Sequence, residues 1–460
     1  MLNRGLSLIG LRILDRATDS YPRVASRAFE RSFVGILGSR PIAARVLRKY
    51  RKQWRTIAQE LEHRKEPLKI LLIVDVCIGD TVLMGGCLDA IHAAYPTADI
   101  HFICNRTGGE LMTAKPGVTV HNFVQGARGF PTEEDNARLL ELIERESFSV
   151  ILNMGPFLDR RMLPPGARAV QMFVPFAAYM LRAWKAKETR HISHYVRSYF
   201  NELLGERGSQ FEQKELPAPA LPLNANTVYL SREAIEMAHA FLDSHGLVAG
   251  SGLVFLNPDA TSQYGQIPFE VQVNLLRHSA SLDEVTAVLL GKAYSNRGIE
   301  RRLMDELPPK LAQKIVVVPH VPIEVYTALI DASDMFISGD TGPLHISACR
   351  KQGPADYKPM RNKTAVLAIY GATDSRMYGY DSEQPYHAPA NQDAPSRSFS
   401  APAVCRNISC INKFGKSCSE VRCFDGLPES EIAEYITSYF RQRTTTPITI
   451  TLKPEREYAF

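Results

Sequence analysis

Continuous apolar runs alternate with helical patterns from residue 68 onward. The first run, Leu68 to Val74, has the composition of a strand buried on both faces of a parallel sheet. Behind it, Leu83, Cys87 and Ile91 repeat at helical spacing. Further strands are expected over 100–104, 118–123 and 149–152, with a helix over 133–146. Because strand and helix alternate, the pattern predicts an open α/β domain.

The same alternation begins again after a proline-rich passage, Leu216 to Leu223, which we expect to be an extended linker. The strands expected beyond it cover 253–256, 286–290, 315–318, 335–338 and 365–370, and a helix covers 429–441. Two such domains would face one another across a cleft, with ligand-holding loops at the carboxyl ends of both sheets. The expected divisions are an N-terminal extension over 1–66, Rossmann-like domains over 67–223 and 224–425, and a C-terminal helix and tail over 426–460.

The first 66 residues hold the positive charge. They carry 15 Lys/Arg against 6 Asp/Glu, which is +9 in a chain whose formal charge is +5, so the rest is slightly acidic. That distribution argues against a nucleic-acid partner. The segment either packs on the rest of the protein as a solvated amphipathic helix or lies on an anionic membrane surface. Its basic residues near Tyr50 and Trp54 are Arg45, Arg48, Lys49, Arg51, Lys52 and Arg55.

A second feature bears on the membrane. The apolar run from Ala169 to Leu181 is too short to span a bilayer and fits an interfacial hairpin or a buried helix pair. We expect no signal peptide, since the apolar stretch before Arg12 is brief and no cleavage site follows. Together the two features predict a cytoplasmic protein, peripheral on the inner face of the inner membrane.

Eight cysteines fall into two groups. One group is scattered through predicted core elements and is expected to be reduced and buried: Cys77, Cys87, Cys104 and Cys349. The late group has the spacing C-x4-C-x7-C-x4-C, looser than the paired knuckles of a zinc site: Cys405, Cys410, Cys418 and Cys423. A structural metal, a disulfide and ordinary loop thiols all stay open for it.

Four polar motifs follow predicted strands: IGDT at 78–81, NPDATS at 257–262, SGDTGPLH at 338–345 and YGATD at 370–374. The third is the strongest, because a helix that begins with small residues and Pro343 presents backbone N–H groups and a positive dipole to a diphosphate. Asp340 would accept hydrogen bonds from sugar hydroxyls. The alternatives are structural: a capped helix with a buried His345, and an Asp80 that merely caps its own helix.

The order of these motifs resembles glycosyltransferase family 9, the heptosyltransferases of lipopolysaccharide core synthesis. D-T-G-P-L-H is its most distinctive piece, and R-C-F-D-G-L-P-E-S-E-I, from Arg422 to Ile432, is similar to the family's usual ending. The resemblance covers roughly residues 68 to 435. It implies a GT-B fold that binds the acceptor in the N-terminal domain and a nucleotide-diphosphate sugar in the C-terminal one. It further implies inverting transfer that uses this donor as co-substrate and needs neither a metal nor another cofactor.

The resemblance also implies roles for particular residues. Asp80 matches the family's catalytic base, where a carboxylate takes the acceptor hydroxyl's proton. The residues expected to bind the donor are Asp340, Thr341, Gly342, His345, Thr261 and Ser262. The family's phosphate-binding Lys is replaced by the stretch Tyr264 to Pro268, with Lys292 as a conceivable substitute. An insertion, Lys351 to Lys363, separates the D-T-G helix from the next strand.

Two functions of different classes follow. The first is a glycosyltransferase that adds a sugar, heptose among the candidates, to a lipopolysaccharide-core, other glycan or lipid-linked acceptor. The second is a catalytically inactive relative that binds carbohydrate or acts as a scaffold. A dehydrogenase is disfavoured, because no G-x-G-x-x-G follows the first strand.

Overall fold

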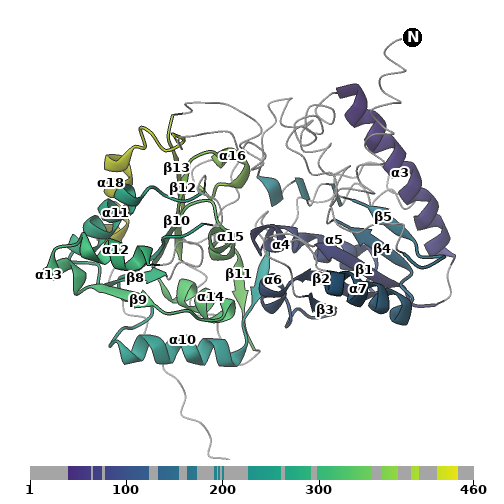
Figure 1. Cartoon of the computed structure of the whole chain (residues 1–460), viewed down its shortest axis with the longest axis horizontal. Helices are drawn as coiled ribbons and strands as arrows, with labels where there is room; N and C mark the ends of the chain where they lie inside the picture. Colours follow the sequence, from purple (N-terminus) through teal and green to yellow (C-terminus); the bar gives the residue numbers. More distant parts are fainter. Residues whose placement is uncertain are drawn as a thin grey trace, which may run out of the picture.

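The chain folds into two α/β lobes that lie side by side, the first purple to blue and the second teal through green to yellow in Figure 1. The computed structural model describes residues 40–63, 66–74, 78–123, 133–154, 163–172, 191–193, 195–196, 199–200, 226–260, 265–291, 298–354, 364–381, 395–402 and 422–443.

The first lobe is built on a five-stranded parallel sheet of order β3-β2-β1-β4-β5. Its strands are β1 (Lys69–Val74), β2 (Asp99–Asn105), β3 (Val118–Phe123), β4 (Val150–Asn153) and β5 (Ala169–Gln171). Its helices include α3 (Arg40–Glu62), α4 (Ile78–Met84), α5 (Gly86–Ala94), α6 (Arg106–Glu110) and α7 (Glu133–Glu146). The predicted strands are confirmed within two residues. The helix expected after β1 is two helices instead, because the chain turns at Gly85.

The second lobe repeats the plan with a six-stranded parallel sheet of order β13-β12-β10-β7-β8-β9. Its strands are β7 (Leu253–Asn257), β8 (Ala287–Gly291), β9 (Ile315–Val318), β10 (Met335–Ser338), β12 (Ala365–Tyr370) and β13 (Arg397–Ser400). Its helices include α10 (Arg232–Ser244), α11 (Phe269–Ser281), α12 (Ile299–Asp305), α13 (Pro309–Ala312), α14 (Ile323–Ala332), α15 (Gly342–Ser347), α16 (Ser375–Tyr378) and α18 (Glu429–Gln442).

Both sheets reverse their winding at one place. Strand order 3-2-1-4 puts the reversal between β1 and β4 in the first lobe and between β7 and β10 in the second. Ligands of open α/β sheets bind outside the carboxyl ends of the strands at such a point. Therefore the loops after β1, β7 and β10, which carry three of the four motifs, occupy the positions where a ligand is expected.

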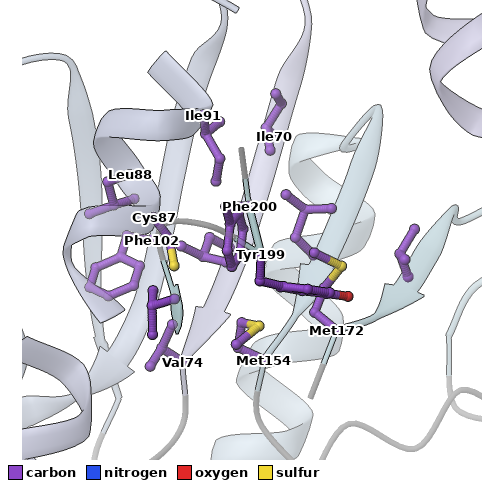
Figure 2. Packing of buried hydrophobic residues seen from close by; sticks show 14 of the residues in the cluster. Ile70, Val74, Cys87, Leu88, Ile91, Phe102, Met154, Met172, Tyr199 and Phe200 are labelled. Carbon is purple, nitrogen blue, oxygen red and sulfur yellow. The ribbon is translucent and has the colours of Figure 1, made fainter. Parts of the chain in front are cut away.

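The core of the first lobe includes residues from both ends of the lobe's sequence. Alternate residues of β1 enter different clusters on the two faces of the sheet, as a strand covered on both sides requires. Figure 2 shows Tyr199 and Phe200 packed among residues of α5 and β1 and beside Met154, which follows β4, so these two aromatic residues belong to the core of this lobe. Helix α3 enters the same cluster through Leu47, Trp54 and Leu61.

A further hydrophobic cluster joins the two lobes. Val82 of α4 and Leu111, just beyond α6, pack with Val228 and Ile346 of the second lobe. Strand β6 (Thr227–Tyr229) pairs in parallel with β11 (Arg350–Gln352), which begins the predicted insertion. The Tyr229 N–H also donates to the Leu111 carbonyl over 2.9 Å. The start of the insertion is thus part of the lobe junction, and residues 355–363 lie outside the described ranges.

Several expectations fall partly or wholly outside the described residues. Ala169–Gln171, the start of the predicted hairpin or helix pair, forms edge strand β5, whereas 173–181 is not described. The same holds for residues 1–39, the proline-rich passage and the four cysteines Cys77, Cys405, Cys410 and Cys418. Cys87, Cys104 and Cys349 are buried as expected, and Cys423 packs half-buried against the second core. Within the described ranges, no helix has the length and hydropathy to cross a bilayer, and no three His, Cys, Asp or Glu side chains cluster as metal ligands would.

Candidate functional site

The first and third motifs meet at the lobe junction. Helices α4 and α15, drawn at the centre of Figure 1, pack directly on one another. Gly342 faces Ile78 so closely that a Cβ on it would collide with the Ile78 Cγ2. A Cβ on Gly79 would lie 2.9 Å from Cδ2 of His345. Residues more than 250 positions apart in the chain are therefore neighbours, and the glycines are what permits this approach.

Asp80 lies at this contact with its side chain exposed. It is the third residue of α4, inside the first turn, so it does not occupy the capping position. Burial, followed by the negative charges of Asp80 and Asp340, raises the pKa of Tyr378. Because Gly79 contacts His345, the candidate base of the first lobe lies near the loop after β10, which was predicted to bind the donor.

Asp340 is held by the fourth motif. Its Oδ2 accepts a hydrogen bond of 2.6 Å from the Thr373 hydroxyl, and its Oδ1 lies 3.7 Å from Nε2 of His345. All three side chains are buried, with exposed fractions of 8% for Asp340 and 5% for His345. The sequence indicated that YGATD follows a strand but gave no sign that its Thr373 orients the carboxylate of the third motif.

The start of α15 offers fewer amides than its sequence indicated. Thr341 is the N-cap, and its Oγ1 accepts from the Leu344 N–H over 3.3 Å. Pro343 has no N–H. Pro343 and Leu344 therefore offer no N–H to a ligand, and α4 lies against the first helical residue, Gly342. An anion at this site would depend on side chains and loop amides as well as on the helix end.

Asn257, the last residue of β7, links the second and third motifs. Its Nδ2 donates to the Ser338 hydroxyl over 3.1 Å, and its Oδ1 accepts from the Tyr326 hydroxyl over 2.9 Å. The Ser338 and Thr341 hydroxyls lie 2.9 Å apart. This network is buried and fixes the loop that follows β10, as a site on rigid elements requires.

A buried glutamine holds both ends of the loop after β7 through hydrogen bonds. Gln272 donates to the Pro258 carbonyl over 3.0 Å and to the Ile267 carbonyl over 2.7 Å. Gly265 approaches the Asp340 backbone, where a Cβ would lie 2.6 Å from the carbonyl oxygen. The tip of this loop, with the predicted Thr261 and Ser262, lies outside the described residues, as does Lys292.

Aromatic residues that the sequence analysis missed complete the junction. The Tyr380 hydroxyl lies 2.9 Å from Nδ1 of His345, and the Tyr380 ring centroid is 5.0 Å from that of His191 in the first lobe. Tyr378 packs against the cores of both lobes. Neither tyrosine belongs to a recognisable motif, because Tyr378 ends a helix of four residues and Tyr380 lies in the loop after it, and neither segment is long enough to show periodicity.

No protein-family model matches this sequence, and no curated protein matches it either. Solved structures do match. The E. coli ADP-heptose LPS heptosyltransferase II superposes with a TM-score of 0.53 at 14% identity, over 82% of this chain and 99% of that one. A glycosyltransferase family 9 protein from Veillonella parvula gives 0.57 at 12% identity, over 83% and 99%. The E. coli heptosyltransferase WaaC with ADP gives 0.50 at 14% identity, over 81% and 100%. The chain therefore has the two-domain GT-B fold of the heptosyltransferases, which confirms the predicted fold.

Proposed function

We propose that the protein is an inverting glycosyltransferase that moves a sugar from a nucleotide-diphosphate donor to a lipopolysaccharide-core, other glycan or lipid-linked acceptor. One observation carries the proposal: the IGDT and DTGPLH motifs of opposite lobes meet at the winding reversals of both sheets, with Asp80 exposed next to the Asp340–His345 pair. The fold shared with heptosyltransferases supports it.

The reaction assigns one task to each lobe. The acceptor hydroxyl oxygen attacks the anomeric carbon while Asp80 takes its proton. The bond from the anomeric carbon to the diphosphate oxygen breaks, and the nucleoside diphosphate leaves with the electron pair. Attack opposite the leaving group inverts the configuration. The scheme uses no metal and no cofactor besides the donor.

Asp340 is proposed to orient the donor sugar. Thr373 fixes one of its oxygens, so the carboxylate presents a defined direction to a sugar hydroxyl. Thr341, Gly342 and His345 would contact the donor from the same loop, joined by Thr261 and Ser262. One solved neighbour is named for ADP-heptose and another contains ADP, which makes ADP-heptose the first donor to test.

We also propose that the protein works on the cytoplasmic face of the inner membrane. The outward side of α3 exposes Arg48, Lys49, Lys52 and Arg55, whereas Trp54 is fully buried. Attraction to anionic lipid would then be electrostatic, because Tyr50 and Trp54 are buried inside the lobe.

Replacing Asp80 with Asn tests the assigned base. Because the amide cannot accept the proton, we expect transfer from ADP-heptose to fall at least 100-fold, within the range that general-base catalysis contributes. Folding and donor binding should be retained. Asp305→Asn, which removes an exposed carboxylate from α12, is the matched control and should transfer at the wild-type rate. Turnover by Asp80→Asn equal to that of the control would refute the role of Asp80.

Donor binding separates the two functional classes. A nucleotide sugar that binds the folded protein must raise its thermal midpoint, whatever the chemistry that follows. We expect a concentration-dependent rise with the true donor in both wild type and Asp80→Asn. If no nucleotide sugar shifts the midpoint, the protein is the inactive relative.

A further inference from the structure

Tyr380 joins the donor loop to the opposite lobe. Its hydroxyl lies 2.9 Å from Nδ1 of His345, and its ring contacts the rings of both His345 and His191, at centroid distances of 5.9 Å and 5.0 Å. Its backbone N–H donates to the Ser398 hydroxyl over 2.9 Å, which fixes the chain at this point. The side chain is 3% exposed, so its contacts are with protein groups.

The direction of the hydrogen bond follows from the groups around His345. The Asp340 carboxylate, 3.7 Å from Nε2, can only accept, so it favours the proton on Nε2. The Nδ1 of the neutral ring is then an acceptor, and the Tyr380 hydroxyl donates to it. Burial raises the pKa of Tyr380 well above its usual range, so the hydroxyl keeps the proton that this bond requires.

We infer that Tyr380 is a positioning residue for glycosyl transfer: its hydroxyl holds His345 in the Nε2–H tautomer, which keeps the ring directed at Asp340. The inference rests on the proposed function. Tyr380 acts through His345 and not on the substrate. Its ring also contacts His191, so the same side chain sets the donor loop relative to the acceptor lobe.

Tyr380→Phe removes the hydroxyl and keeps the ring. We expect kcat to fall about tenfold, because displacement of a catalytic constellation by a fraction of an ångström has effects of this size. The KM for the donor should change less than twofold. The matched control is Tyr435→Phe, which deletes a hydroxyl bonded to the Pro395 carbonyl at the far side of the second lobe. It should leave both constants unchanged.

A second readout does not depend on activity. With ¹⁵N-labelled histidine, and with His345→Gln to assign the resonance, NMR reports which ring nitrogen of His345 carries the proton. The wild type and Tyr435→Phe should show the Nε2–H form, and Tyr380→Phe a mixture of the two tautomers. Thermal unfolding verifies that each variant is folded.

The outcomes are distinguishable. An unchanged kcat in folded Tyr380→Phe overturns the inference, and so does an unchanged tautomer. If the wild type transfers no sugar from any nucleotide donor, the proposed function fails, and the tautomer measurement alone decides whether Tyr380 directs His345.

Discussion

Gly342 is the point at which a single side chain would force the lobes apart. A methyl group here collides with Ile78, which belongs to a packed helix and has little room to move. We expect Gly342→Ala to destabilise the protein by about 1–3 kcal/mol, the usual cost of overpacking. Transfer should fall as well, because α4 carries Asp80 away from Asp340. Denaturant unfolding and turnover measure the two effects.

The partner residue provides the control for this variant. Ile78→Ala removes the Cγ2 atom that the new methyl would meet. In the double variant Gly342→Ala/Ile78→Ala, the stability loss should therefore be smaller than the sum of the two single losses, since residues in contact are coupled. Strictly additive losses would show that the collision at α15 does not determine the spacing of the lobes.

At the residue scale, the sequence predicted which loops matter but not which side chains hold them. Asp340 and His345 were predicted because they follow a buried strand within a motif, whereas the role of Asp80 came from the resemblance to glycosyltransferase family 9. The three residues come together at one junction. Thr373 and Tyr380 could not be assigned. Their partners lie 33 and 35 positions away in the chain, and only folding brings such pairs together.

Helix α3 is the element whose two faces have separate tasks. Its inward face contributes Leu47, Trp54 and Leu61 to the first core, so a deletion that reaches residue 60 would remove a core helix. Its outward face is available for a different test. Replacing its four exposed cations with Gln should preserve the fold and weaken binding to vesicles containing phosphatidylglycerol. The four residues are Arg48, Lys49, Lys52 and Arg55.

The size of this effect follows from charge. Each cation near an anionic surface contributes about 1 kcal/mol, so the loss of four should make the variant bind such vesicles roughly 1,000-fold more weakly at low salt. A control with the same net charge neutralises four exposed cations of the second lobe: Arg301, Lys310, Arg422 and Arg441. Equal vesicle binding by the two variants would mean that α3 is only a solvated helix.

At the element scale, burial decided what could be predicted. Strands β1, β10 and β12 are apolar runs buried on both faces, and the sequence predicts such runs as strands. The strands that were missed are short, and two of them are polar: β11 is Arg-Lys-Gln and β13 is Arg-Ser-Phe-Ser. Their assignment depends on the neighbour with which each pairs, which no local pattern specifies.

On the scale of the whole molecule, the two lobes share a buried apolar cluster, whereas the interface of a freely hinged enzyme is expected to be polar. Val82 and Leu111 of the first lobe are fully buried among second-lobe residues, and β6 is bonded to both lobes. Interfaces of this kind couple the stability of the domains they join. Thus the fold repeats one Rossmann-like plan twice, but its two units are not expected to unfold independently.

The tryptophans allow this coupling to be measured. The chain has two, Trp54 and Trp184, and Trp54 is buried in the first core, so in a Trp184→Phe background tryptophan fluorescence reports the first lobe alone. Ile436→Ala opens a cavity in the second core, far along α18, at a cost of about 2–5 kcal/mol. If the junction couples the lobes, this variant should lower the denaturation midpoint seen by tryptophan fluorescence as much as that seen by circular dichroism. A fluorescence midpoint that stays at the wild-type value would mean that the lobes unfold separately, and that the contact between α4 and α15 opens before either core does.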